Sequence, residues 1–473
     1  MDVAVLDDVV GTTWNEQLID ELTDYITIPA LSPAFDSDWE SNGHIRAAVQ
    51  HIFRWINAQT IAGMSSRVVE LPGRTPVIVA EIPAFGAAAQ NARTVLLYGH
   101  CDKQPEMIGW ESDLGPWKPV RRGEKLYGRG GADDGYAAYA SLTAIKAVQE
   151  SGGSHPRCVL LIEASEESGS PDLPAHVEAL ADTLGEVSLV VCLDSGCANY
   201  DTLWLTSSLR GMVAATVTVD VLTEGVHSGG ASGVVPSSFR IIRQLLDRIE
   251  DSSTGAVLLE SANTPIPQHR LAEAVAMDSF LGHQEEPYPW IDGVTPMATG
   301  AEAQLNKTWR PTVSYIGADG FPLPANAGNV LRPSSALRLS LRLPPIADAD
   351  AALEELVEKL TTKPPSNARV RVDHPESASG WNAPDLAPWL RTSLNSGSQR
   401  SFGGPLQIMG EGGSIPFMGM LGDRFPAAQF AIMGVLGPES NAHGPNEFLH
   451  LTYAQKLTSV LGSLLNDAVS APS

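Results

Sequence analysis

The chain has 473 residues, of which 43% are hydrophobic and 18% are charged, and its formal net charge is −24. This length fits two or three domains, and the composition is that of an ordinary globular protein. The strong negative charge argues against binding to nucleic acid or to an anionic membrane surface, and it favours the attraction of cations.

The first and last parts of the chain alternate helical and strand patterns. Apolar residues recur at helical spacing in the segments 14–27, 43–58 and 135–150. Short unbroken apolar runs predict strands at 77–82, 95–99, 158–164, 189–193 and 430–437. Such strands, alternating with helices, predict an α/β domain with a mainly parallel sheet and helices on both faces.

The segment 207–384 has a different pattern. Apolar and polar residues alternate in strands predicted at 212–222, 312–316, 336–343 and 369–372, with helices predicted at 237–250 and 349–362. The order strand, helix, strand, strand, helix, strand predicts a small antiparallel sheet with helices on one face, an α+β ferredoxin-like domain. We therefore predict a first domain formed by residues 1–206 and 385–473 and interrupted by an inserted domain at 207–384. The segment 252–310 has no clear pattern.

Histidine and carboxylate side chains follow the predicted strands of the first domain. They are His100 and Asp102 after 95–99, Glu166 and Glu167 after 158–164, Asp194 after 189–193, and His443 in the loop after 430–437, with Asp133 and Asp134 just before the helix at 135–150. Ligands of open α/β sheets bind beyond the carboxyl ends of the strands. We therefore expect these side chains to meet at one edge of the sheet.

Each of these residues alone has a simpler explanation, since Asp133 or Asp134 could cap a helix and Glu166 with Glu167 could form an exposed acidic loop. Together, however, so many carboxylates would repel one another unless a cation compensated them. Histidine and carboxylate ligands suit zinc or manganese better than magnesium or calcium. The number of groups is enough for two divalent ions that share a carboxylate, with another carboxylate left as general base.

The four cysteines, Cys101, Cys158, Cys192 and Cys197, are too few for a disulfide framework, and no two form a CxxC pair. We expect them to be reduced, in a cytoplasmic protein. The first residues, MDVAVLDDVV, lack the basic start and apolar core of a signal peptide, and no run of 18 apolar residues predicts a membrane span.

The motifs GHCD, YGRGGADD, EASEESGS, LDSG, VHSG, GEGGSIP and AHGPNE occur in the order found in the co-catalytic metallopeptidases, and the chain resembles that family over residues 15–466. It looks most like the branch of carnosinases and cytosolic nonspecific dipeptidases, on the segments 308–320, 339–345 and 410–417. The resemblance implies a zinc-peptidase-like catalytic domain whose inserted domain serves as a lid and as the surface of a homodimer.

The resemblance also implies roles for single residues. The residues that would hold two divalent ions, zinc or manganese, are His100 and Asp194 for one ion, Glu167 and His443 for the other, and Asp133 as the bridge. The peptide bond from Asp133 to Asp134 would be cis. Asp102 would orient His100, and Glu166 would be the general base that activates the metal-bridging water as hydroxide.

Further roles implied by the resemblance fall in and beside the inserted domain. His227 would reach the active site of the partner subunit and stabilise the oxyanion. Arg342 and Ser414, with the backbone at Gly413, would bind the C-terminal carboxylate of the substrate, and Asn329 would add a polar contact. From the pattern of residues alone, His227 and Arg342 could equally be surface residues of a strand end and of an alternating strand.

We therefore expect a metal-dependent hydrolase that cleaves the amide bond of dipeptides or short peptides with a free C-terminal carboxylate. The alternative is an amidohydrolase acting on N-acyl amino acids or another modified amide, because the Gly-His-Gly-Gly stretch common in the dipeptidase branch has no clear counterpart around His374. A catalytically silent homologue fits less well, since neither Glu166 nor any of the expected ligands is replaced.

Overall fold

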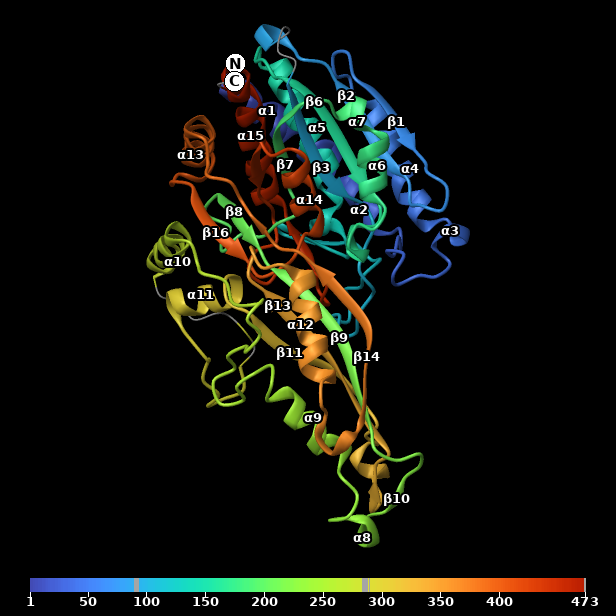
Figure 1. The fold of residues 1–473 in the computed structure, drawn as a ribbon. Helices are drawn as coiled ribbons and strands as arrows, with labels where there is room; N and C mark the ends of the chain where they lie inside the picture. Colours follow the sequence, from blue (N-terminus) through green and yellow to red (C-terminus); the bar gives the residue numbers. More distant parts are fainter. Residues whose placement is uncertain (89–92, 283–287, 289, 472–473) are drawn as a thin grey trace. The chain divides into compact units, whose positions relative to one another are not determined.

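The computed structural model describes residues 1–88, 93–282, 288 and 290–471, and it divides into two compact units (Figure 1). Unit 1 consists of Met1–Ser207, Ala383–Met409 and Met420–Ser473, and unit 2 of Ser208–Asn382 and Gly410–Gly419. These limits lie close to the predicted boundaries of the inserted domain. The exception is the segment 410–419, which we predicted as part of the catalytic domain but which packs within unit 2.

A six-stranded sheet is the core of unit 1. Its strands, in spatial order, are β1 (Ser65–Val69), β2 (Val77–Ile82), β6 (Arg157–Glu163), β3 (Thr94–His100), β7 (Val187–Cys192) and β17 (Gln429–Ile432). The last four are parallel neighbours, whereas β1 pairs antiparallel with β2 and β2 with β6. The sheet is thus mixed, and its parallel part consists of the strands that precede the histidines and carboxylates. β3 is buried along its whole length.

Helices pack around this sheet. The helices of unit 1 are α1 (Val3–Thr13), η1 (Trp14–Leu18), α2 (Ile19–Ile26), α3 (Trp39–Asn42), α4 (His44–Ala58), α5 (Ala137–Glu150), α6 (Leu173–Ala179), α7 (Ala181–Leu184), α13 (Pro388–Phe402) and α15 (Leu451–Asp467). α5 contacts β3 and β6, α15 contacts α5, and α4 contacts β1 and β2. The three helices predicted in this part of the chain are therefore present.

One predicted strand is shorter than expected. The apolar run 430–437 leaves the sheet after Ile432, and Gly434 then lies so close to the backbone of Ser195 that a Cβ atom would overlap it. None of the four cysteines forms a disulfide, as expected, and all are buried. The helices that the structure describes are all too short or too polar to cross a membrane.

Unit 2 is built on a four-stranded antiparallel sheet in the order β11 (Thr312–Asp319), β13 (Ser334–Leu343), β9 (Gly211–Asp220) and β14 (Arg369–Ala378). Alternate residues of β9 and β13 pack against α9 (Ser238–Leu246) and α12 (Ala349–Thr361) in one apolar core. The strand order and the two helices on one face correspond to a ferredoxin-like arrangement.

The rest of unit 2 surrounds this sheet. α10 (Gln268–Leu281) and α11 (Gly300–Thr308) lie in the segment for which the sequence has no clear pattern, and they share a small core of Ala274, Leu305 and Trp309. The short strands β10 (Val226–His227) and β12 (Val330–Leu331) pair beside α8 (Ser228–Ala231). The chain passes between the units within β8 (Trp204–Leu209), after β15 (Trp381–Asn382), and within β16 (Gln407–Glu411) and α14 (Pro416–Arg424).

Candidate metal centre and substrate-binding residues

The residues expected to hold metal ions come together in unit 1. They are His100 at the end of β3, Asp133 in the turn η3 (Gly131–Gly135), Glu167 in η4 (Glu166–Ser168) after β6, Asp194 after β7, and His443 in the loop that follows β17. The parallel strands end at the same edge of the sheet, so residues far apart in sequence lie side by side there.

Two groups of three side chains have the geometry of metal sites. In the first, ligand atoms of His100, Asp133 and Asp194 all lie within 4.8 Å of one another, and in the second those of Asp133, Glu167 and His443 do. The two groups share Asp133.

The two oxygens of the Asp133 carboxylate face different histidines. Oδ1 lies 3.3 Å from His100 Nε2, and Oδ2 lies 3.0 Å from His443 Nε2. A carboxylate in this position can bridge two ions. The peptide bond from Asp133 to Asp134 is cis, as expected.

The electrostatics of the cluster favour a bound cation. Burial raises the pKa of Glu167 to about 7 and that of Asp194 to about 6, and it raises the pKa of Glu166 well above its usual range. At Asp133 burial acts in the same direction, but hydrogen bonds from His100 and His443 outweigh it and lower the pKa. Buried carboxylates that resist ionisation are stabilised by a divalent cation. Imidazole nitrogens and carboxylate oxygens are also the donors that zinc and manganese accept, so the residues fit a pair of such ions.

Asp102 has a wider set of contacts than the sequence suggested. Its Oδ1 lies 3.4 Å from His100 Nδ1 and accepts a hydrogen bond from the Glu166 N–H at 3.1 Å. Its Oδ2 accepts from the Glu167 N–H at 3.0 Å. The side chain is fully buried. One carboxylate therefore contacts the imidazole of His100 and fixes the backbone that carries Glu166 and Glu167.

The residues expected to bind the substrate carboxylate form a second cluster, in unit 2. The guanidinium of Arg342 donates a hydrogen bond to Ser414 Oγ at 3.2 Å, and the Ser414 hydroxyl donates to the carbonyl of Arg210 at 2.5 Å. The Arg210 N–H donates to the carbonyl of Gly413 at 3.0 Å. The structure thus brings Arg342, Ser414 and Gly413 together through Arg210, a residue that sequence reasoning missed.

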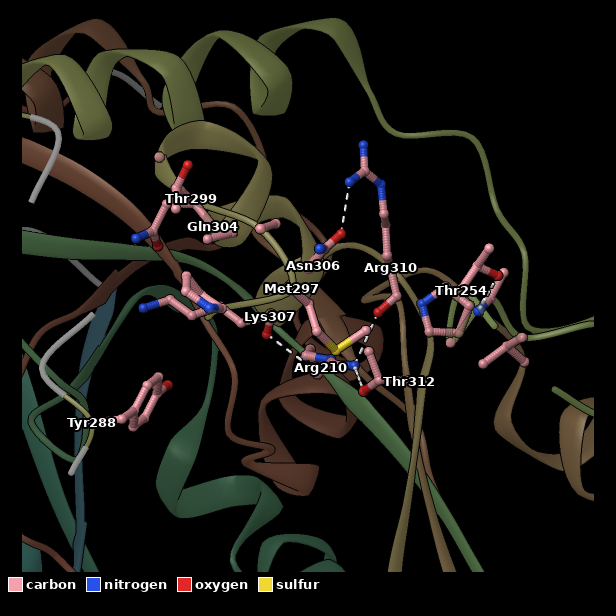
Figure 2. A pocket seen from close by; sticks show the side chains of 18 of the residues that line it. Arg210, Thr254, Tyr288, Met297, Thr299, Gln304, Asn306, Lys307, Arg310 and Thr312 are labelled. Atoms are coloured by element: carbon pink, nitrogen blue, oxygen red, sulfur yellow. Dashed lines mark hydrogen bonds between the residues drawn. The ribbon is translucent and has the colours of Figure 1, made fainter. Parts of the chain in front are cut away.

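A pocket of about 510 Å³ in unit 2 shares Arg210 with this cluster (Figure 2). The Arg210 guanidinium donates to the carbonyls of Lys307 and Arg310, both at 3.0 Å, and to the hydroxyl of Thr312 at 2.7 Å. The Lys307 carbonyl belongs to the last turn of α11, so a positive charge faces the negative end of that helix. Most of the lining comes from 254–310, so the segment without a sequence pattern builds the pocket.

His227 and Asn329 form a third group, also in unit 2. β10 pairs with β12 so that His227 lies opposite Val330, the residue after Asn329. The Ser228 N–H donates to the Asn329 carbonyl at 2.9 Å. Both residues are exposed, and His227 Nδ1 accepts from the Gly229 N–H at 3.1 Å. The imidazole is therefore at a surface of unit 2, as both interpretations of the sequence allow.

Comparison with known proteins identifies relatives over most of the chain. The family model described as Peptidase family M20/M25/M40 matches residues 96–467. A protein of Corynebacterium striatum named cysteinylglycine-S-conjugate dipeptidase is 29% identical over 388 residues, which cover 77% of this chain and 80% of the relative.

Two solved structures share the fold. The di-peptidase Dug1p from Saccharomyces cerevisiae superimposes with a TM-score of 0.76 at 21% identity, covering 100% of this chain and 99% of its own. Human carnosine dipeptidase 1 does so with a TM-score of 0.74 at 19% identity, covering 99% and 100%.

Proposed function

Because the chain belongs to the peptidase family M20/M25/M40 and is therefore a metallopeptidase, we propose that it hydrolyses dipeptides and short peptides with a free C-terminal carboxylate. The observation that carries this proposal is the pair of ligand groups that share Asp133. The named relatives are dipeptidases, which favours dipeptides over the N-acyl amino acids of the alternative interpretation.

Each group would hold one ion, zinc or manganese. His100 and Asp194 would hold the first ion, Glu167 and His443 would hold the second, and Asp133 would contribute to both. When bound, such a pair polarises the scissile carbonyl and lowers the pKa of water.

Glu166 is then the general base. Its carboxylate takes a proton from the attacking water and passes it to the leaving amine. Burial raises the pKa of Glu166, the direction in which enzymes shift a glutamate that transfers protons. The Glu166 N–H donates to Asp102, and this hydrogen bond fixes the backbone from which the Glu166 side chain extends.

Arg342 and Ser414 hold the carboxylate of the C-terminal residue, for which the Ser414 hydroxyl turns from the carbonyl of Arg210 to the substrate. Arg342 makes no ion pair within the described ranges, so no carboxylate of the chain neutralises its guanidinium, which can pair with the carboxylate of the substrate. A guanidinium with a hydroxyl and a glycine-rich backbone is a suitable receptor for a carboxylate. In this proposal Arg342 binds the substrate, in place of the alternative of an outward residue on an alternating strand.

We assign the pocket of Figure 2 to the side chain of that C-terminal residue. Thr312 lines the pocket and lies directly opposite Arg342 in the pairing of β11 with β13. Side chains opposed in this way stand about 5 Å apart on the same face of a sheet. A residue whose carboxylate contacts Arg342 can therefore place its side chain in the pocket.

We further propose a homodimer formed through unit 2. β11 is an edge strand, and its residues Tyr315 and Ile316 are exposed by 44% and 62%. Phe239 on α9 and Phe321 after β11 are also exposed and contact each other. An exposed edge strand can pair with a strand of another chain, and exposed apolar patches mark protein–protein contacts. In such a dimer His227 of one subunit would stabilise the oxyanion formed at the other.

The function is tested on protein freed of metal by a chelator and then restored with zinc or with manganese. The substrates are free dipeptides, the same dipeptides with an amidated C-terminus, N-acetyl amino acids and longer peptides. We expect metal-dependent cleavage of free dipeptides and loss of at least tenfold in kcat/KM on amidation. Cleavage of N-acetyl amino acids with no cleavage of dipeptides would contradict the proposal and establish the deacylase alternative.

A further inference from the structure

The two ligand groups are held by different kinds of structure. His100 and Asp194 come directly from the ends of the buried strands β3 and β7 and are themselves buried. His443 comes from a loop between β17 and β18 (Phe448–His450), and its side chain is 54% exposed. The position of His443 therefore depends on how that loop is held.

The loop has a demanding backbone. Glu439, Asn441, His443 and Asn446 all have positive φ angles, between 52° and 65°. Residues other than glycine seldom adopt this conformation, because the Cβ atom approaches the backbone too closely. Such a conformation persists only where surrounding contacts stabilise it.

A buried ion pair supplies that contact. Arg129 and Glu447 form a salt bridge with exposed side-chain fractions of 1% and 0%. Arg129 also donates to the carbonyl of Gly444 at 2.9 Å, and the Gly130 N–H donates to Glu447 Oε1 at 2.8 Å. Arg129 precedes Asp133 by four residues and Glu447 follows His443 by four. The pair therefore joins the turn that carries one ligand to the loop that carries the other.

The turn of Asp133 packs closely on residues of unit 1 outside the loop of His443. A Cβ atom at Gly130 would lie 2.7 Å from the side chain of Lys103, and one at Gly135 would lie 2.2 Å from Tyr25, so the turn packs closely on these residues. Apart from the ion pair, the loop packs at Gly437 against Tyr200, and the Gly128 N–H donates to the Glu447 carbonyl at 3.0 Å. Its exposed contacts include an ion pair of Lys125 with Glu439 and a hydrogen bond from the Glu111 N–H to Asn446 Oδ1 at 2.8 Å. Exposed contacts contribute little, and the ion pair is a buried contact that reaches Gly444, the residue after His443, so the position of His443 depends on it.

We infer that Arg129 and Glu447 are positioning residues that hold His443 beside Asp133, and that the ion bound by Asp133, Glu167 and His443 depends on them. The ion bound by His100, Asp133 and Asp194 does not. The inference rests on the proposed metal centre. A buried ion pair adds little stability over an apolar pair of the same size, so its value lies in fixing the geometry of the loop.

The test is metal binding to the intact protein, measured by competition with a chromophoric chelator for zinc and for manganese. We expect the natural chain to bind two ions, and Glu447→Gln to bind one as before and the second 10- to 100-fold more weakly, as is typical when a residue that orients a ligand is changed. Raising the metal concentration should restore the turnover of Glu447→Gln. Turnover that stays low at saturating metal would contradict the inference.

Two further variants separate positioning from folding. In the double variant Arg129→Met/Glu447→Leu, apolar side chains replace the pair, so we expect near-normal thermal stability with the same weakened second ion. Lys125→Gln removes an exposed pair of the same loop and should keep both ions. If Glu447→Gln and the double variant bind two ions normally, the inference is wrong but the proposed metal centre stands. The same holds if both ions are weakened equally. A natural chain that binds fewer than two ions would overturn the metal centre as well.

Discussion

Replacing Asp102 by asparagine tests whether one buried carboxylate organises both sides of the metal centre. Asp102 accepts from two backbone N–H groups, of Glu166 and Glu167, and faces His100 Nδ1. Asparagine keeps the shape but has one oxygen, so its amide nitrogen must face an N–H group that it cannot satisfy. A buried donor left without an acceptor costs about 1–3 kcal/mol.

That cost should appear as a loss of affinity for the metal ions. Weakened orientation of a ligand lowers affinity about 10- to 100-fold, which corresponds to about 1.4–2.8 kcal/mol and is comparable to the lost hydrogen bond. The assay is zinc competition against a chelator, with thermal unfolding of the metal-free protein in parallel. Asp20→Asn, an exposed change on α2, is the matched control and should leave both readings unchanged. Normal affinity and normal turnover in Asp102→Asn would refute the reasoning.

Three further predictions concern single residues. Glu166→Gln should retain both ions and lose about 10²- to 10⁴-fold in kcat, the usual contribution of a general base, as measured by turnover and metal content together; near-normal turnover would reject the assignment. His227→Ala should keep the dimer and the metal while lowering kcat, and unchanged kinetics with an intact dimer would show that the imidazole does not act on substrate. Burial, with the nearby Asp102 charge, raises the pKa of Glu163 from 4.5 to about 7, so its contribution to stability is present below about pH 4.5 and is lost as the pH rises through 7. Glu163→Gln removes this titrating group. Between pH 4.5 and pH 8 the free energy of unfolding of the metal-free variant, measured in urea, should therefore rise by up to about 3 kcal/mol relative to that of the natural chain. A difference between the two proteins that does not change with pH would contradict this.

The strands of the fold and the residues of the candidate metal centre were largely predictable because their signals are local. An unbroken apolar run followed by His100, or by Asp194, marks a buried strand and its end without knowledge of the rest of the chain. The alternation in 336–343 likewise marks a strand with one buried face, as β13 has. Such patterns reflect burial directly, and burial decides secondary structure in these segments.

The remaining features depend on contacts between distant residues. The pair of Arg129 and Glu447 joins positions 318 residues apart, and no pattern near either residue indicates the other. Asp102 reaches the backbone of Glu166 across neighbouring strands in the same way. α10 has only three buried residues, one of them Arg270, so its sequence carries little helical periodicity. The segment 410–419 belongs to unit 2 through its contacts with distant residues, so its place could be found only from the structure.

The most direct test of the account is crystallography with anomalous scattering, recorded at the zinc edge from crystals grown with zinc. We predict two peaks, one contacted by His100, Asp133 and Asp194 and the other by Asp133, Glu167 and His443. The Asp133 carboxylate should lie between the two peaks. A single peak without contact to Asp133, or two peaks elsewhere in the protein, would contradict the central claim that these residues form a two-metal centre.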